Sequence, residues 1–411
     1  MDKVLLSGNE AIARGAYEAG VLVASAYPGT PSTEILENAT RYPEIDASWA
    51  PNEKVALEVG IGASFGGARA LVTMKHVGVN VAADPLFTLS YTGVRGGLVL
   101  VVADDPELHS SQNEQDSRNY AKFSKVPMFE PADSQEAKEF TKLAFEAGEQ
   151  FDTPMFLRST TRISHAKSIV TLEDRPTDIP QPSLVRDAAK LVMLPANARK
   201  RHYDVEDRLI RMAEWSNAQP FNRIEKGAGQ VGVITAGVSY QYVKEVMPDA
   251  DVLKIGLVHP LPEQLIRDFA ANYETLYVVE ELDPYIEEQV RAMGINVIGK
   301  EKLPICGELT PGRIRKALFG LDAPVEDNSP ELPPRPPNMC PGCPHRGVFM
   351  ELNRAKAYVT GDIGCYTLGF LPPLSAMDTC VCMGASIGNA TGISKVISEE
   401  EQRKVVAVIG D

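Results

Sequence analysis

The residues best suited to chemistry lie between Cys340 and Asp411, a stretch that holds five of the six cysteines. Cys340, Cys343 and His345 fall in CPGCPHR, and the strand-like KVVAVIGD ends at Asp411. Thiolates are soft metal ligands, whereas a carboxylate at the end of a strand suits a hard cation such as Mg²⁺. The pattern therefore indicates a soft-metal site beside a hard-cation site.

The spacing of Cys340 and Cys343 allows two thiolates to bind one metal ion. A zinc site would need a second close pair, and no second CxxC follows. A [4Fe-4S] cluster could instead take Cys340, Cys343 and Cys365, with a fourth thiolate from beyond the chain end or from Cys380 or Cys382. Buried structural thiols are the alternative interpretation.

A second group of candidates lies near the N-terminus. Thr30 and Ser32 in YPGTPST stand at a strand-to-helix turn that suits an anion, although either hydroxyl could simply cap the helix. Glu53 opens a helix, where a carboxylate ordinarily complements the helix dipole. His76 follows an apolar strand and His109 lies in a polar loop, so both are candidate catalytic groups that could equally be structural.

Composition excludes several classes of protein. A chain of 411 residues with 44% hydrophobic content can bury several cores. The net charge of -14, without a run of Lys or Arg, argues against nucleic-acid binding. No apolar run of about 18 residues and no signal peptide are seen. We expect no membrane partner, a cytoplasmic location and cysteines used for metal or redox chemistry rather than disulfides.

The elements that must position these residues follow an alternating pattern. Buried strands are predicted in VLVASAY, ALVTMKH, GLVLVVA and PMFLRST, with helices between them, which is typical of a doubly wound parallel-sheet α/β fold. Ser7 with Glu10 predicts a capping box, and Pro31 predicts a helix start after Thr30. The expected order is 1–165 doubly wound, 166–228 irregular and connecting, 229–325 a second α/β unit, 326–337 a Pro-rich linker, and 338–411 a third unit.

The motifs together resemble a known family. YPGTPST, NEKVALEVGIGAS, ADDPELHSSQNEQDSR, CPGCPHR, GDIGCYTLG, MDTCVCMGASIGNATG and the terminal VIGD are similar, in this order along the whole chain, to the α subunits of indolepyruvate:ferredoxin oxidoreductases. These are thiamine-diphosphate-dependent 2-oxoacid:ferredoxin oxidoreductases. The resemblance implies a pyrimidine-binding domain at 1–165, a transketolase-C-like domain at 229–325, and the first part of a diphosphate-binding domain at 338–411.

The resemblance also implies roles for single residues. Glu53 would hold the pyrimidine ring of thiamine diphosphate, because the cofactor needs a buried carboxyl group there to become reactive. Thr30 would bind the substrate carboxylate, and His76 and Asn80 would line the pocket. Asp411 would be the first Mg²⁺ ligand. The residues expected to surround the cofactor in the C-terminal part are Cys365, Cys382, Met383, Gly384, Gly410 and Asp411.

The implied activity is oxidative decarboxylation of aryl 2-oxoacids, indolepyruvate first, to aryl-acetyl-CoA and CO₂. Electrons would pass through [4Fe-4S] clusters to ferredoxin, with coenzyme A as co-substrate. The implied partners are a smaller β subunit and ferredoxin, in a homodimer of α subunits or in αβ pairs. The resemblance further implies that the chain stops before the end of the diphosphate-binding domain.

One feature departs from pyruvate-specific relatives, which carry a substrate-binding arginine near ADDPELHSS. This sequence has no arginine there before Arg118, which is compatible with a larger, aromatic 2-oxoacid. Two other functions stay open. A non-oxidative thiamine-diphosphate-dependent decarboxylase would release an aldehyde and would not need the cysteines, and a metal-stabilised assembly subunit would bind zinc without catalysis.

Overall fold

The computed structural model describes residues 2–322, 333 and 337–410. Contacts divide the chain into two units, Met1–Val325 and Glu326–Asp411. The domains predicted at 1–165 and 229–325 both fall within the first unit. Most of the predicted linker at 326–337 lies outside the described residues, and so does Asp411.

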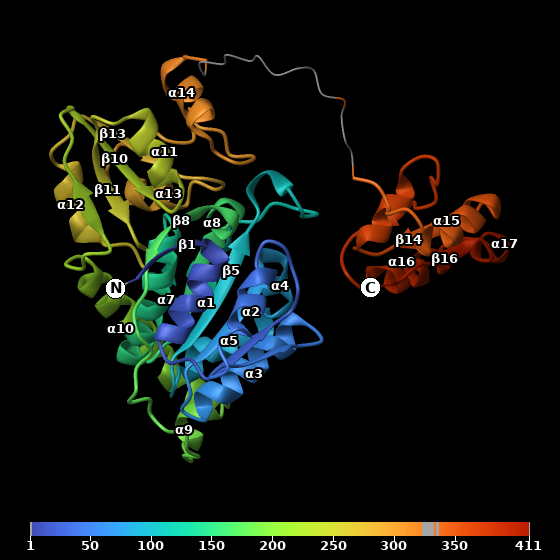
Figure 1. The fold of residues 1–411 in the computed structure, drawn as a ribbon, viewed down its shortest axis with the longest axis horizontal. Coiled ribbons are helices and arrows are strands. Elements are labelled where there is room, and N and C mark those ends of the chain that lie inside the picture. Colours follow the sequence, from blue (N-terminus) through green and yellow to red (C-terminus); the bar gives the residue numbers. More distant parts are fainter. Residues whose placement is uncertain (1, 323–332, 334–336, 411) are drawn as a thin grey trace. The chain divides into compact units, whose positions relative to one another are not determined.

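A seven-stranded sheet forms the centre of the first unit (Figure 1). Neighbouring strands are parallel except for the pair β12 and β6, which is antiparallel. Strands β4, β5, β6 and β7 are mainly apolar and buried throughout, as expected for strands covered by helices on both sides, whereas the edge strand β3 is largely exposed. In spatial order the strands are β12 (Leu257–His259), β6 (Met128–Phe129), β7 (Met155–Thr160), β5 (Leu98–Asp104), β4 (Ala70–Lys75), β2 (Val23–Ala26) and β3 (Asp46–Trp49).

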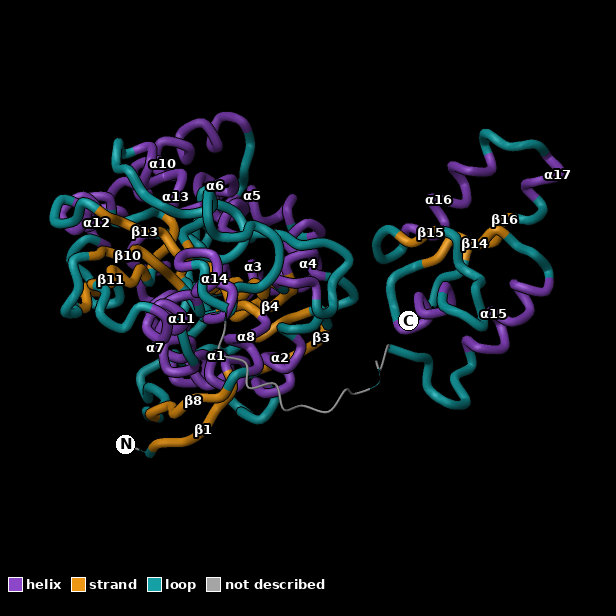
Figure 2. The backbone as a smooth tube through the Cα atoms, turned by 90° about the horizontal axis from the view of Figure 1, so that it is seen from above, coloured by secondary structure: helices purple, strands orange, loops and turns teal. Residues whose placement is uncertain are grey.

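Helices cover both faces of this sheet (Figure 2). One face packs against α1 (Gly8–Glu18), α2 (Thr33–Ala39) and α7 (Ser134–Phe151). The other packs against α3 (Glu53–Phe65), α4 (His76–Val81), α5 (Ala83–Thr92) and α6 (Ser117–Ser124). The prediction of a doubly wound parallel-sheet α/β fold is confirmed.

The two local helix signals have different outcomes. Ser7 and Glu10 form the predicted capping box at the start of α1. Pro31 does not begin a helix, because α2 starts at Thr33, and the side chain of its N-cap residue, Ser32, accepts no hydrogen bond from the helix. The hydroxyl of Ser32 donates to the Gly29 carbonyl at 2.8 Å instead, so these residues close a turn ahead of the helix.

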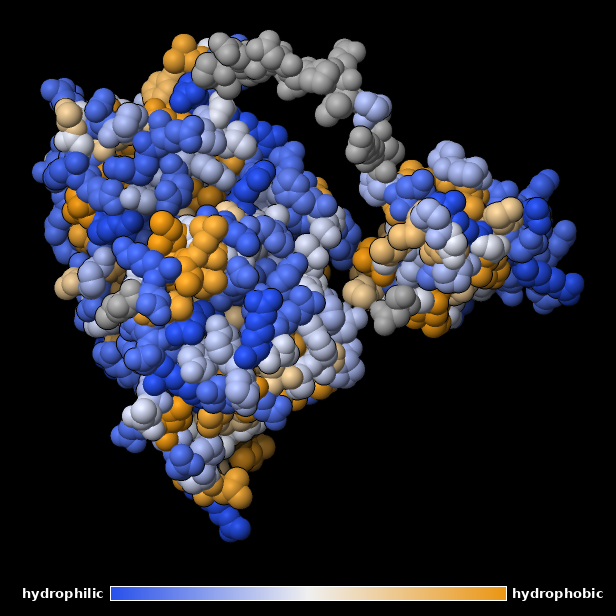
Figure 3. Space-filling view, viewed as in Figure 1, coloured by the Kyte–Doolittle hydropathy of each residue, from blue (hydrophilic) through white to orange (hydrophobic). Residues whose placement is uncertain are grey.

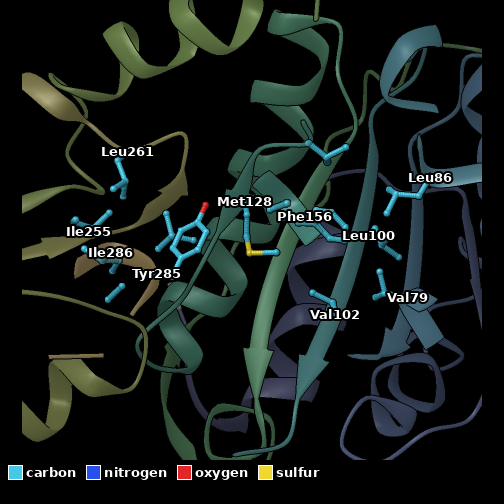
Figure 4. Close-up of a cluster of buried hydrophobic side chains, with 14 of the residues drawn as sticks. Val79, Leu86, Leu100, Val102, Met128, Phe156, Ile255, Leu261, Tyr285 and Ile286 are labelled. Atoms are coloured by element: carbon cyan, nitrogen blue, oxygen red, sulfur yellow. The ribbon is translucent and has the colours of Figure 1, made fainter. Parts of the chain in front are cut away.

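A four-stranded sheet forms the second layer of the first unit. Its strands are, in spatial order, β13 (Thr275–Val279), β10 (Val231–Ala236), β11 (Asp251–Ile255) and β9 (Arg223–Glu225), and its helices are α11 (Ser239–Val246), α12 (Glu263–Ala270), α13 (Tyr285–Ala292) and α14 (Pro311–Phe319). One continuous core joins the two sheets, since β12 pairs with β6. Figure 4 shows side chains of this core from both parts: Leu100, Val102, Met128 and Phe156 from the first, and Ile255, Leu261, Tyr285 and Ile286 from the second.

The stretch 166–228, which was expected to be irregular, contains regular structure. Helix α10 (Pro195–Ser216) runs for 22 residues, with Pro195 in its first turn, where the missing N–H costs nothing. That proline begins the helix, so the prediction was wrong here. The shorter elements of this stretch include β8 (Lys167–Thr171) and α9 (Ala188–Leu191). Two other short elements lie before it, η1 (Pro106–Leu108) and α8 (Thr161–His165).

Strand β8 pairs antiparallel with β1 (Lys3–Ser7) at the surface. Leu5 and Ile169 face each other across the pair and are 61% and 64% exposed. Figure 3 shows apolar side chains gathered in this region of the visible face. None of the described helices is both long and apolar enough to cross a lipid bilayer.

Arg158 is the centre of a buried ionic cluster inside the first unit. Its guanidinium contacts Asp104 at 2.7 Å and Glu130 at 2.5 Å, and all three side chains are nearly inaccessible to solvent. The three residues come from the end of β5, the end of β6 and the middle of β7. Removing one partner of such a cluster leaves an uncompensated buried charge, which costs about 3–5 kcal/mol.

Arg118 joins this cluster to the second sheet. It contacts Asp116 at 2.5 Å and Glu280, which follows β13, at 2.6 Å. It also donates to the carbonyl of Glu281 at 2.7 Å. The guanidinium group of Arg118 is therefore occupied by contacts within the protein, and it cannot serve as a substrate-binding group.

The second unit has a smaller parallel sheet of three strands, β15 (Thr379–Cys380), β14 (Tyr358–Gly361) and β16 (Val405–Ala407), in that order. Its helices are α15 (His345–Arg354), η2 (Cys365–Phe370), α16 (Ala385–Ser394) and α17 (Glu399–Gln402). A compact core around Phe349, Val359 and Tyr366 holds them together. This unit is again a parallel α/β structure.

The buried carboxyl group of Glu281 predicts a pH-dependent stability. Burial raises its pKa from 4.5 to about 7. The folded protein therefore holds a proton that the unfolded chain releases near pH 4.5, so this contribution is complete below that pH and is lost as the pH rises through 7. We expect the free energy of unfolding to fall by about 3 kcal/mol between pH 5 and pH 8 through this group. Urea unfolding at both pH values measures the change.

The variant Glu281→Gln should largely remove this dependence, because it stays neutral at every pH. Glu288→Gln is the matched control, since Glu288 is exposed on α13. An unchanged pH profile in Glu281→Gln would contradict the assignment.

Candidate cofactor and substrate site

Glu53 is the first residue of α3 and is buried, with 9% of its surface exposed. Asn52 caps the helix by accepting from the Val55 N–H at 2.9 Å, which fixes where the helix begins and where Glu53 lies. Within the described residues the carboxyl group has no side-chain hydrogen bond or ion pair. Burial raises its pKa, and its own backbone N–H partly opposes that shift. A partnerless buried acid of this kind is suited to bind or protonate a ligand.

Gly78 in α4 creates the space for this carboxyl group. A Cβ atom on Gly78 would lie 2.5 Å from Cγ and 2.7 Å from Oε1 of Glu53. Those distances are shorter than van der Waals contact, so only glycine allows the carboxyl group its present place. The MKHVGVN motif and the NEKVAL motif therefore meet at Gly78 and Glu53.

His76 begins α4 and is completely buried. Its Nε2 atom lies 3.2 Å from the carbonyl oxygen of Asn113, and its Nδ1 atom has no partner among the described residues. Since a carbonyl only accepts, Nε2 carries a hydrogen, and in the neutral imidazole Nδ1 then presents a lone pair. The ring is therefore oriented as a hydrogen-bond acceptor.

The other N-terminal candidates are more exposed. Thr30 lies at the surface, with no hydrogen bond to its hydroxyl from the described residues. Asn80 is exposed and accepts from the Tyr120 hydroxyl at 2.6 Å. His109 lies 3.5 Å from Glu308, beyond hydrogen-bond distance for a neutral ring. Thr30 is thus free to bind a ligand, whereas Asn80 and His109 already have protein neighbours.

Sequence reasoning missed two residues that the structure places at these edges. Lys75, the last residue of β4, is 7% exposed and precedes His76 directly. Asp362, which follows β14, is 2% exposed and accepts from the Gly384 N–H at 2.8 Å and from the Ile363 N–H at 2.7 Å. A charged residue at the end of a buried parallel strand, or directly after it, was the signal in both cases.

The C-terminal candidates gather at one edge of the small sheet. The parallel strands β14, β15 and β16 all end there, and Cys365, Gly384 and Gly410 lie in the segments that follow them. The Tyr366 hydroxyl donates to the Gly410 carbonyl at 3.1 Å. Cys382 and Met383 precede Gly384 and are exposed. Asp411 lies outside the described residues.

The cysteines do not form a metal site as they stand. No group of three His, Cys, Asp or Glu side chains in the described ranges is arranged to hold a metal ion. Cys343 instead faces His345, with Sγ 3.6 Å from Nδ1, and Cys380 donates to the Asp362 carbonyl at 3.4 Å. Cys340 and Cys365 are exposed free thiols. A cluster bound by Cys340, Cys343 and Cys365 therefore has no support in this arrangement and stays a prediction.

Comparison with known proteins places this geometry in a class. Residues 14–200 match the family described as "Pyruvate flavodoxin/ferredoxin oxidoreductase, thiamine diP-bdg". A solved 2-oxoglutarate:ferredoxin oxidoreductase from Magnetococcus marinus has the same fold, with a TM-score of 0.61 and 17% identity over 77% of this chain and 65% of that one. The class is that of the 2-oxoacid:ferredoxin oxidoreductases.

Closer relatives define the family. The indolepyruvate oxidoreductase subunit IorA of Archaeoglobus fulgidus is 45% identical over the whole of this chain, which spans 70% of that protein. The same subunit of Thermococcus kodakarensis is 43% identical, again over the whole chain and 70% of the relative. The chain therefore belongs to the indolepyruvate oxidoreductase IorA subunit family.

The fit between Gly78 and Glu53 can be tested by adding one methyl group. We expect Gly78→Ala to displace the carboxyl group and to lower turnover by the assembled oxidoreductase about 100-fold, the effect of misplacing a catalytic group by about 1 Å. The fold should survive, because the displaced atoms belong to a side chain.

The matched control is Gly62→Ala in α3, where an added Cβ meets nothing within 4 Å. Steady-state turnover and thermal unfolding of both variants provide the comparison. Equal turnover in the two variants would show that the close approach of Gly78 is unimportant.

Proposed function

We propose that this chain is the thiamine-diphosphate-binding α subunit of an enzyme that oxidatively decarboxylates aryl 2-oxoacids, with indolepyruvate as the first substrate. The products are aryl-acetyl-CoA, CO₂ and reduced ferredoxin. The observation that carries the proposal is the buried, partnerless Glu53, in a chain that is 45% identical over its whole length to an indolepyruvate oxidoreductase subunit. Ferredoxin and a smaller β subunit are the proposed partners.

The residues of the first unit fit the pyrimidine end of thiamine diphosphate. That cofactor supplies a carbon nucleophile for the ketone of a 2-oxoacid and a sink for the electrons left by decarboxylation. Glu53 would hydrogen-bond a nitrogen of the pyrimidine ring. Burial raises the pKa of its carboxyl group, which favours the protonated form that can donate this hydrogen bond. His76 would accept a hydrogen bond through Nδ1, which has no protein partner among the described residues. Thr30 would bind the substrate with its exposed hydroxyl.

The second unit would hold the diphosphate end. The N–H groups around Gly384 and Gly410 follow parallel strands, where phosphate groups are commonly bound. Asp362 holds Gly384 in its positive-φ conformation, with φ at 82°. Asp411 would supply a carboxylate to Mg²⁺. Cys365, Cys382 and Met383 would lie near the cofactor at the same sheet edge.

The variant Glu53→Gln tests the cofactor role. In the oxidoreductase assembled with its partner subunit, we expect decarboxylation to fall by about 10²–10⁴-fold, because the amide cannot exchange a proton with the pyrimidine ring. Binding of thiamine diphosphate should persist. Release of CO₂ and a calorimetric titration with the cofactor measure the two properties.

Glu58→Gln is the control for this experiment, since Glu58 is exposed on the same helix. Near-wild-type turnover in Glu53→Gln would reject the role of Glu53.

The oxidative character of the reaction needs a separate experiment. The enzyme purified anaerobically with its partner should contain iron, sulfide and thiamine diphosphate, and should reduce ferredoxin only when indolepyruvate and coenzyme A are both present. Iron–sulfur clusters carry electrons one at a time and so suit transfer to ferredoxin, whereas a non-oxidative decarboxylase needs none. Release of indole-acetaldehyde without ferredoxin reduction would favour that alternative, and zinc without iron or thiamine would favour an assembly subunit.

A further inference from the structure

Lys75 is a buried cation whose hydrogen-bonding capacity is only partly used. Its Nζ atom donates to the Ser110 carbonyl at 2.5 Å, and no other hydrogen-bond partner exists among the described residues. An ammonium group has three N–H donors, so two remain without an acceptor. Leaving charged donors unsatisfied in a buried place costs free energy, and burial lowers the pKa of this amine. Such a group is suited to an anionic ligand.

The neighbouring carboxylate does not provide the missing acceptors. Asp105 forms no ion pair within 4 Å of Lys75, although its charge opposes the shift of the lysine pKa. Its oxygens accept from Ser110 N–H at 2.8 Å, from the Ser111 hydroxyl at 2.5 Å and from the Thr161 hydroxyl at 2.7 Å. Asp105 therefore shapes the loop beside Lys75 and leaves the two N–H donors open.

Lys75 lies beside the residues assigned to substrate and cofactor. A Cβ atom on Gly29 would lie 3.1 Å from the Cβ of Lys75, so the YPGTPST turn with Thr30 packs on this lysine. Three residues further along, Gly78 packs on Glu53. The first turn of α4 thus connects the lysine to the buried acid.

The nearby arginines have no free charge to offer. Arg118 and Arg158 are held by buried carboxylates, and Arg162 makes two contacts with Glu308. A guanidinium group whose charge is already balanced by a carboxylate is a poor receptor for a further anion, even where one nitrogen, Nη2 of Arg158, has no partner among the described residues. Lys75 differs from these three because no carboxylate in the described part of the chain lies within 4 Å of it and only one of its three donors is used.

We propose that Lys75 binds the carboxylate of the 2-oxoacid substrate. The two open N–H donors would pair with the carboxylate oxygens, and the Thr30 hydroxyl on the adjoining turn would add a further hydrogen bond. This assignment rests on the proposed function. Lys75 would provide the positive charge for the substrate carboxylate, because the segment ADDPELHSS has no arginine to do so. It makes Lys75 a specificity-determining residue for acids over neutral ketones.

The variants Lys75→Met and Lys75→Gln test the proposal in the assembled oxidoreductase. We expect the KM for phenylpyruvate and for indolepyruvate to rise by about 10–100-fold, the usual loss for a charged hydrogen bond, while affinity for thiamine diphosphate stays unchanged. Lys75→Gln keeps a donor for the Ser110 carbonyl, so a folding defect in Lys75→Met does not remove the test. Lys138→Met is the control for loss of a buried lysine, because Lys138 is also buried but pairs with Glu18 at 2.8 Å.

Equilibrium binding of phenylpyruvate and of its methyl ester gives a second readout that does not depend on turnover. The lysine variants should weaken binding of the acid about 10-fold or more and leave binding of the ester unchanged. Equal effects on acid and ester, or none on either, would overturn the proposal. Wild-type protein that binds phenylpyruvate but never oxidises it would reject the proposed function, and the binding comparison would still decide the role of Lys75.

Discussion

The buried ionic cluster around Arg118 and Arg158 is the interaction on which the candidate site of the first unit depends. It links the end of β5, the residue after β6 and the middle of β7 to the residue that follows β13 in the second sheet. Asp104 and Asp116 belong to the cluster and stand at the two ends of the loop 105–116. Because buried charges tolerate little displacement without loss of their partners, both ends of this loop are held in place.

The same loop supplies the protein contacts of two site residues. Its carbonyl groups at Ser110 and Asn113 contact Lys75 and His76. The second sheet also reaches it, since Glu114 accepts from the Gly307 N–H at 3.1 Å. The four-stranded sheet and its helices carry no candidate site residue of their own. They nevertheless help to position the Lys75 ammonium group and the His76 ring.

The polar groups of the candidate site have fewer hydrogen-bond and ion-pair partners than the ionic cluster that supports it. Arg118 and Arg158 each pair with two carboxylates, whereas Glu53 lacks a side-chain partner within the described residues and Lys75 uses one of three donors. Binding sites commonly keep unsatisfied groups at a cost in stability, because a ligand later supplies the missing contacts. An unpaired acid and an underused cation at one sheet edge fit the two proposed ligands, a cofactor with a ring nitrogen and a substrate with a carboxylate.

The sequence by itself determined most element types of the first 165 residues, the strand-end positions of Thr30, Glu53 and His76, and the family. Periodicity and capping are local properties, so short stretches suffice to predict them. Only the tertiary structure decided that Arg118 forms a buried ion pair with Glu280. It also decided that Lys75 is buried with two N–H donors that have no acceptor among the described residues. The partners in these contacts are far apart in the chain, and burial and charge pairing exist only once the sheets have packed together.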